Sequence, residues 1–152
     1  NNNKKICTIS LIGRTNINDV MSNNPFEVAD QIISEVKADI YMVDFHAEAT
    51  AEKLAMGYFL DGRITGLFGT HTHIPTADNR VLPNGTGYIT DLGMTGPSNS
   101  ILGMDIKTAL IRFVKSLPEK YKVAEGPVEL NGAIFDIDDK TNKVKSVYRI
   151  HL

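Results

Sequence analysis

The feature that most constrains the fold is an alternation of short apolar runs with amphipathic segments in the first half of the chain. Residues 4–12, 39–45 and 64–68 are apolar and rich in β-branched side chains, which is typical of strands. Residues 25–38 and 49–60 carry apolar side chains at helical spacing. An order of strand, helix, strand, helix and strand predicts a parallel sheet whose strands are joined by crossover helices.

The second half of the chain has a different pattern, in which turn residues separate shorter apolar runs. Asp105 can cap a helix, whose apolar side chains Ile106, Ala109, Leu110 and Phe113 are expected to face inward. The predicted segments are hairpin strands over 79–82 and 86–90 around the turn 83–85, an ordered loop over 91–103, a helix over 105–116, and antiparallel strands over 121–124, 128–136 and 143–150. The predicted fold class is therefore α/β, a single domain over residues 1–152 with a parallel β-α-β-α-β first half and antiparallel C-terminal strands.

Composition and charge exclude several classes of protein. The chain has 152 residues, 42% of them hydrophobic and 22% charged, which fits one globular domain and argues against disorder. Its formal charge of −2 gives no electrostatic basis for binding a nucleic-acid duplex or an anionic membrane. The single cysteine, Cys7, lies in an apolar run and is interpreted as a strand residue of the interior rather than a nucleophile. We expect a soluble, cytoplasmic protein.

Three of the four histidines follow predicted strands directly. His46 comes after the strand at 39–45, and His71 and His73 come after the strand at 64–68. The carboxyl ends of parallel strands meet at one edge of a sheet, where ligands bind. In extended backbone, residues two apart project to the same side, so His71 and His73 are expected to face one site, with Gly69 allowing a sharp bend before them. The alternative for an isolated histidine such as His46 is a structural role.

Charged residues near these histidines have two interpretations each. Asp44 and Glu48 flank His46 and can hold an imidazole in one tautomer, but Glu48 can equally cap the helix at 49–60. Arg14 follows the first strand and can meet a phosphate at the same edge, or can be an exposed loop residue. His151 is assigned no function. The phosphate-binding loop and the nucleophile elbow have no matching sequence in the chain.

Four motifs give the chain a specific resemblance. They are Asp44-Phe45-His46-Ala47-Glu48-Ala49-Thr50, Gly69-Thr70-His71-Thr72-His73, Thr76-Ala77-Asp78-Asn79-Arg80 and Ile89-Thr90-Asp91-Leu92-Gly93-Met94-Thr95-Gly96-Pro97. With these motifs the chain resembles the calcineurin-like metallophosphoesterases, specifically the bacterial YmdB-like branch, whose members are taken to be 2′,3′-cyclic-nucleotide phosphodiesterases. The resemblance runs from about residue 4 to the C-terminus. It implies that the chain forms part of a metallophosphoesterase β-sandwich with flanking helices.

The resemblance also implies roles for the histidines. His46 matches the isolated histidine motif of the family, and His71 and His73 match its G-x-H-x-H motif. All three are metal ligands in the family, whose complete enzymes hold two divalent or trivalent metal ions. Mn or Fe is the expected metal, with Zn as an alternative.

The chain departs from the family pattern in its N-terminal motifs. Family members begin with a strand ending in Gly-Asp, followed by Asn-Gly-Glu-Asn and Gly-Asn-His segments, which supply the bridging carboxylates and the general-acid histidine. These motifs are absent from the sequence, so no catalytic residue is assigned in this chain. Two dications about 3.5–4 Å apart repel by about 18 kcal/mol at an effective dielectric of about 20, which three neutral imidazoles cannot offset. The chain, taken as the C-terminal part of a family member, is therefore expected to be inactive alone.

The function expected from these observations is that of a metal-dependent phosphodiesterase, which hydrolyses 2′,3′-cyclic nucleotides or similar phosphodiesters through a binuclear metal site. Two alternatives stay open. One is a non-catalytic or complementing fragment that acts in assembly. The other is a mononuclear metal hydrolase that adds Asp44 or Asp78 to the three histidines. An unpaired sheet edge also predicts association of the chain with itself or with the missing N-terminal half.

Overall fold

The computed structural model of the chain describes residues 3–17 and 23–152. Its elements, in chain order, are β1 (Ile6–Ile12), α1 (Pro25–Glu35), β2 (Ile40–His46), α2 (Thr50–Leu60), β3 (Gly66–Thr70), β4 (Arg80–Val81), β5 (Gly87–Ile89), β6 (Gly96–Pro97), α3 (Ile106–Lys115), β7 (Val128–Glu129), β8 (Asn131–Ile137) and β9 (Val144–His151). No helix in this part of the chain has the length and apolar character needed to cross a membrane.

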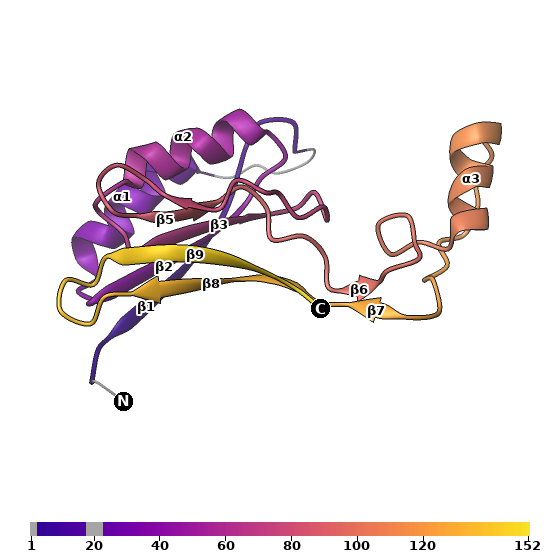
Figure 1. Cartoon of the computed structure of the whole chain (residues 1–152). Helices are drawn as coiled ribbons and strands as arrows, with labels where there is room; N and C mark the ends of the chain where they lie inside the picture. The colour runs from indigo at the N-terminus through magenta and orange to yellow at the C-terminus, as the bar shows by residue number, and fades with distance from the viewer. Residues whose placement is uncertain (1–2, 18–22) are drawn as a thin grey trace.

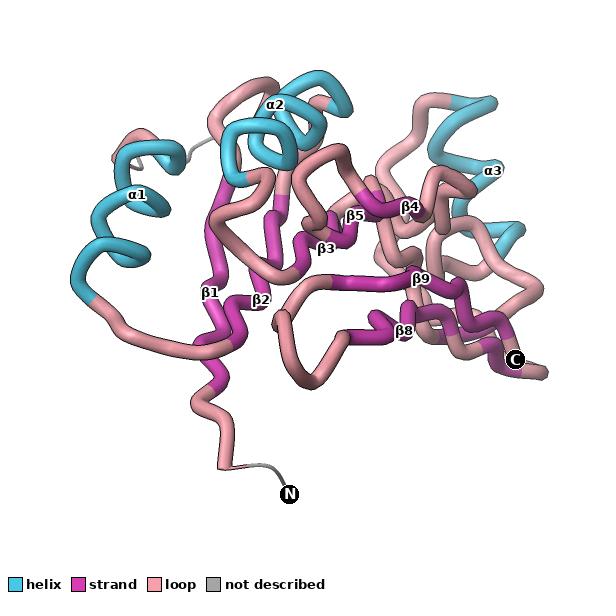
Figure 2. Tube along the Cα trace, turned by 60° about the vertical axis from the view of Figure 1, so that its left-hand side comes forward, coloured by secondary structure: helices cyan, strands magenta, loops and turns pink. Residues whose placement is uncertain are grey.

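The central sheet has the strand order β1-β2-β3-β5-β4. Strands β1, β2, β3 and β5 run parallel, and β4 pairs antiparallel with β5. Helices α1 and α2 cover one face of this sheet (Figure 2). The antiparallel pair of β8 and β9 lies against the other face, where β9 contacts β4 and β5. The predicted α/β class is therefore confirmed, with a parallel first half and antiparallel C-terminal strands.

The main core lies between the central sheet and its two helices. Val43 and Phe45 of β2 are fully buried and belong to one cluster with Met56 and Leu60 of α2. Burying such side chains stabilises the fold by about 1.5–3 kcal/mol each. Cys7 is half-buried against the same cluster, in agreement with its interpretation as a strand residue.

Two neighbouring glycines leave space for a side chain on the other face of the sheet. Gly66 of β3 and Gly87 of β5 are register partners. A Cβ atom at Gly66 would lie 3.0 Å from the ring of Phe135, and one at Gly87 would lie 2.6 Å from it. The ring of Phe135 in β8 can therefore approach the sheet this closely only because both positions lack side chains. Through this contact the β8–β9 pair packs against β3 and β5.

The predicted elements of the first half are all present, with small shifts of their ends. Helix α1 ends at Glu35 rather than at residue 38, because the hydroxyl of Tyr41 donates to the carbonyl of Val36 and accepts from the amide of Ala38. Strand β3 runs two residues further than predicted, since its pairing with β2 continues to Thr70. The predicted hairpin is also confirmed, as the antiparallel pair of β4 and β5.

The strand predicted over 128–136 is two strands with different partners. β7 pairs with β6, a short strand inside the segment expected to be a loop, and β8 pairs with β9. The break lies next to Asn131, which is buried and donates from its side-chain amide to the carbonyl of Met94 at 2.7 Å. The strand predicted over 121–124 is reduced to one isolated bridge between Val123 and Met104.

Helix α3 forms where predicted, and the carboxylate of Asp105 accepts the amide of Thr108 at 3.0 Å as its cap. The expectation that its apolar side chains face inward is wrong for Ile106, Leu110 and Phe113, which are 45%, 49% and 76% exposed. Ala109 alone of the four is buried. The reason is position: α3 projects away from the sheets, beyond β6 and β7 (Figure 1).

Candidate functional site

The carboxyl ends of β2 and β3 bring two histidines into contact. His46 is the last residue of β2 and pairs in register with Thr70, the last residue of β3; His71 follows directly. The Nε2 atom of His46 lies 3.0 Å from the Nδ1 atom of His71. Their rings meet edge-on, with centroids 4.8 Å apart and an interplanar angle of 84°. The sheet topology brings these two residues, 25 positions apart in the sequence, to the same edge.

A hydrogen-bonded chain fixes the ring of His46. The hydroxyl of Thr70 donates to Oδ1 of Asp44 at 2.9 Å, and the same hydroxyl lies 3.1 Å from Nδ1 of His46. A carboxylate only accepts hydrogen bonds, so the single hydroxyl proton of Thr70 points to Asp44. The bond to His46 must then be donated by an Nδ1–H group of the imidazole. This leaves the lone pair of His46 on Nε2.

Glu48 holds the second imidazole. Its Oε2 atom lies 2.8 Å from Nε2 of His71. Glu48 does not cap the following helix. The N-cap residue of α2 is Ala49, and no side-chain capping bond is present there. Since the carboxylate of Glu48 accepts, His71 donates from Nε2.

In each imidazole, one nitrogen already makes a hydrogen bond to Thr70 or Glu48, and the other nitrogen faces the second imidazole. In the neutral forms, the lone pair of His46 Nε2 and that of His71 Nδ1 point at each other across 3.0 Å. Two lone pairs at this distance repel each other, unless a proton lies between them or a metal ion lies beside them. The facing pair of nitrogens can therefore accept a cation.

The backbone at His71 and His73 is not extended, contrary to the assumption made from the sequence. The backbone φ angles of His71 and His73 are 114° and 67°, so the segment turns sharply at both residues. The carbonyl of His73 accepts the amide of Met94 at 3.0 Å, which ties this residue to the segment after β5. The metal-ligand roles of His46, His71 and His73 stay predictions. Within residues 3–17 and 23–152, no group of three or more histidine, cysteine or acidic side chains is arranged to hold a metal ion.

The bend before the histidines is not made by Gly69, contrary to the expectation from sequence. Gly69 lies within β3, and its φ angle is not positive. Its lack of a side chain serves a close approach instead: a Cβ atom there would lie 1.8 Å from the carbonyl oxygen of Thr90 and 3.0 Å from Cδ of Lys53.

Lys53 and Asp91 form a buried ion pair behind the site that sequence reasoning missed. Nζ of Lys53 lies 2.8 Å from Oδ2 of Asp91, and both side chains are 1% exposed. Burial by itself raises the pKa of Asp91, but hydrogen bonds from Lys53, Gly93 and Thr72 outweigh it and hold the pKa below its ordinary value. A lysine inside a helical segment carries no sequence signal of such a role. Asp91 lies within one of the four motifs, but no role could be predicted for it from the sequence.

The two remaining candidate residues, Arg14 and Asp78, form no hydrogen bond or ion pair with the imidazole pair among the described residues. The amide of Arg14 donates to Oε1 of Glu52 at 2.9 Å, and the residue is exposed in the loop after β1. Asp78 accepts the hydroxyl of Thr76 at 2.6 Å and the amide of Thr90 at 3.1 Å. Burial raises the pKa of Asp78, but the hydrogen bonds lower it by more, so the pKa lies below its ordinary value. Asp78 therefore serves the loop structure.

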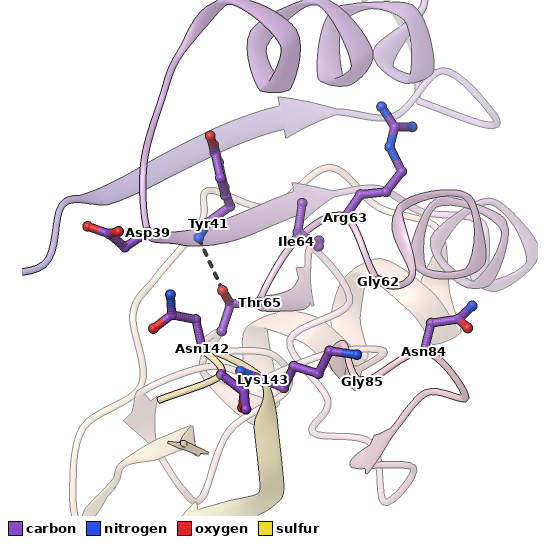
Figure 3. Close-up of a pocket in the computed structure, with 11 residues that line it drawn as sticks. Asp39, Tyr41, Gly62, Arg63, Ile64, Thr65, Asn84, Gly85, Asn142 and Lys143 are labelled. Atoms are coloured by element: carbon purple, nitrogen blue, oxygen red, sulfur yellow. Dashed lines mark hydrogen bonds between the residues drawn. The ribbon is translucent and has the colours of Figure 1, made fainter. Parts of the chain in front are cut away.

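A polar pocket of about 220 Å³ lies at the opposite edge of the sheet (Figure 3). Its wall includes Tyr41 at the start of β2 and Thr65 just before β3, joined by a 3.3 Å hydrogen bond. Lys143 and Gly85, from two turns, complete one side. Because the strands are parallel, this amino-end pocket is separate from the histidines at the carboxyl ends.

The fold and the site define an α/β protein that presents an imidazole pair, backed by carboxylates, at the carboxyl ends of its parallel strands. The model of the YmdB-like protein family matches the sequence over residues 1–150. The chain therefore belongs to the YmdB-like family, as its motifs suggested.

Similar proteins of known name support this assignment. The chain is 50% identical over 151 residues to a protein of Bacillus subtilis (strain 168) named 2′,3′-cyclic-nucleotide 2′-phosphodiesterase, and the match covers 98% of this chain and 56% of that protein. A crystal structure of a novel phosphatase from Mycoplasma pneumoniae matches with a TM-score of 0.93 and 38% identity, covering 100% of this chain and 54% of that one.

A third similar structure is that of a hypothetical protein from Thermus thermophilus, with a TM-score of 0.88 and 35% identity. The match covers 57% of that protein's chain and 97% of this chain. The chain thus spans about half the length of the relatives that it matches.

Proposed function

We propose that this chain supplies the imidazole side of a metal-dependent phosphodiesterase site, and that the whole protein hydrolyses 2′,3′-cyclic nucleotides or similar phosphodiesters. The observation that carries the proposal is the contact between His46 Nε2 and His71 Nδ1 at 3.0 Å, with the other nitrogen of each ring bonded toward a carboxylate. The name of the Bacillus subtilis relative supports the substrate class.

The donor set fits a metal ion. Metal-binding imidazoles commonly donate their second N–H to a carboxylate or a related acceptor, which orients the ring and raises its basicity. Thr70 and Asp44 provide this support to His46, and Glu48 provides it to His71. Imidazole nitrogens suit Fe or Zn, and added carboxylates suit Mn. A bound metal would supply Lewis-acid polarisation of a phosphoryl oxygen and activation of a water molecule.

We further propose that the complete site holds two metal ions and draws its remaining ligands from outside the described residues. Two imidazoles in contact are too few for a closed metal site, which needs four ligands for Zn and more for Mn or Fe. Bridging anionic ligands are also needed, because two neighbouring dications repel strongly. The relatives are about twice as long as this chain, and their additional length is the expected source of these ligands.

Among residues 3–17 and 23–152, no contact favours a mononuclear hydrolase built from this chain alone. That alternative requires Asp44 or Asp78 as a direct ligand. Asp44 accepts the hydroxyl of Thr70, and Asp78 accepts from Thr76 and Thr90. Both carboxylates therefore already have hydrogen-bond donors within the fold.

The test is hydrolysis of 2′,3′-cyclic AMP by the whole protein, after chelation and after readdition of Mn²⁺. We expect no activity after chelation, recovery with Mn²⁺, and a loss of at least about 100-fold in His71→Ala. His151→Ala is the matched control, because His151 contacts Asn131 in the C-terminal strand pair. Full activity of His71→Ala would contradict the proposal. Hydrolysis of phosphate monoesters but not of the cyclic diester would assign a phosphatase instead.

A further inference from the structure

The buried ion pair of Lys53 and Asp91 lies directly behind the loop that carries His71 and His73. Lys53 belongs to α2 and is fully buried, and Asp91 follows β5. The remaining acceptor capacity of Asp91 is used on backbone amides: Oδ2 accepts Thr72 N–H at 3.0 Å, and Oδ1 accepts Gly93 N–H at 2.9 Å. Thr72 is the residue between the two histidines.

The histidine loop needs such an anchor, because its backbone is strained. His71 and His73, with φ angles of 114° and 67°, are non-glycine residues in the left-handed region on both sides of Thr72. Such conformations are unfavourable for residues with a Cβ atom and persist only where surrounding contacts enforce them. The enforcing contacts come from the segment that begins at Asp91. Its carboxylate binds the Thr72 amide, and the amides of Leu92 and Met94 donate to the carbonyls of Gly69 and His73.

Lys53 in turn determines where the carboxylate of Asp91 lies. The ammonium group approaches Oδ2, the same oxygen that binds Thr72. A buried carboxylate without this cation would be uncompensated and would be driven to reorient or to recruit water. Gly69 leaves the space through which the Lys53 side chain passes.

We propose that Lys53 and Asp91 are positioning residues, which hold the His71-Thr72-His73 loop in the conformation that presents the imidazole of His71 at the sheet edge. The structure already shows one result of this conformation, the contact of His71 with His46 and Glu48. The inference rests on the proposed function in one respect only, namely that the imidazoles bind a metal ion.

The experiment uses Lys53→Met in the whole protein, because this change keeps the length of the side chain and removes its charge. The readouts are the ¹⁵N shifts of the imidazole nitrogens and the affinity for Co²⁺ alone. Met56→Ala is the matched control for stability, because Met56 is a fully buried residue of the same helix within the main core. Arg63→Met is the control for loss of an ion pair, since Arg63 pairs with Asp30 at the surface.

We expect Lys53→Met to move the imidazole signals of His71 and His73 and to weaken Co²⁺ binding by about 10–100-fold. The two controls should leave both readouts unchanged, although Met56→Ala lowers the melting temperature. Imidazole signals and Co²⁺ affinity within about twofold of the wild type in Lys53→Met would overturn the proposal.

A second variant keeps the test decisive if Lys53→Met does not fold. Lys53→Met combined with Asp91→Asn leaves no unpaired buried charge, and it should fold but still show displaced imidazole signals and weaker Co²⁺ binding. Wild-type readouts in this double variant would also overturn the proposal. If the wild-type whole protein binds no Co²⁺, the metal part of the proposed function fails, while the imidazole signals still decide the positioning role.

Discussion

The hydroxyl of Thr70 links a carboxylate to an imidazole, and this makes it the residue whose role is easiest to isolate. Thr70→Val keeps the shape of the side chain and removes the bridge between Asp44 and His46. We predict about 10–100-fold weaker Zn²⁺ binding by calorimetric titration, because loss of such outer contacts typically has this effect. Thr70→Ser keeps the hydroxyl and should bind as the wild type does. Equal affinity of the valine and serine variants would contradict the assignment.

The lowered pKa of Asp91 makes a prediction about acid stability. In the unfolded chain this carboxyl has an ordinary pKa near 3.8, and in the folded chain its pKa is lower, because the hydrogen bonds from Lys53, Gly93 and Thr72 outweigh the effect of burial. The unfolded state therefore binds the proton first, and the stabilisation present above about pH 4 is lost as the pH falls through the folded value.

Urea unfolding between about pH 3 and 6 measures this loss. We expect a free energy of unfolding that decreases below about pH 4 in the wild type, and a shallower decrease in Asp91→Asn. The slope should not vanish, since the pKa of Asp78 is also lowered. An identical pH dependence in the two proteins would contradict the account of Asp91.

At the scale of elements, the close packing of β3 against the segment after β5 depends on one glycine. A side chain at Gly69 would collide with the backbone carbonyl of Thr90, at 1.8 Å from Cβ, and the backbone cannot yield cheaply there. We predict that Gly69→Ala destabilises the fold by about 3 kcal/mol or more, as overpacking against backbone does at the upper end of its range. Gly132→Ala in β8 is the control, because no atom lies within 4 Å of its added Cβ. Similar melting temperatures for the two variants would contradict this interpretation.

The elements that could be predicted from sequence are those whose signal is local. The strands and helices of the first half follow from apolar periodicity, and the hairpin follows from its turn residues. The pairing of β6 with β7 could not be predicted, since the two short strands lie far apart in the sequence. The orientation of α3 failed for a related reason: periodicity gives the apolar face of a helix but not whether this chain provides a surface to cover it.

The site shows the same division between local and long-range signals. His46 and His71 could be placed at one edge because strand ends in a parallel sheet converge. The roles of Lys53 and Asp91 could not be placed, because they depend on a contact between a helix and a loop that are 38 positions apart. The strained φ angles of His71 and His73 could not be read from sequence either, since such conformations are imposed by tertiary contacts.

At the scale of the whole molecule, β1 is an edge strand, whose pairing within the described residues is with β2 only. Ile6 and Ile12 on this strand are 64% and 45% exposed, and Phe113 and Val114 of α3 are 76% and 75% exposed. We propose that in the isolated chain these surfaces are covered by a second copy of the same chain. Light scattering at micromolar concentration should show association of the isolated chain, and a monodisperse monomer would contradict the proposal.

We propose above all that the facing nitrogens of His46 and His71 bind a metal ion, and the most direct measurement is a Zn²⁺ titration of the ¹⁵N-labelled whole protein followed through its imidazole signals. The account predicts that His46 Nε2 and His71 Nδ1 shift together as Zn²⁺ is added, while both nitrogens of His151 stay unchanged. Signals of His46 and His71 that do not respond to millimolar Zn²⁺, or that move no more than those of His151, would contradict it.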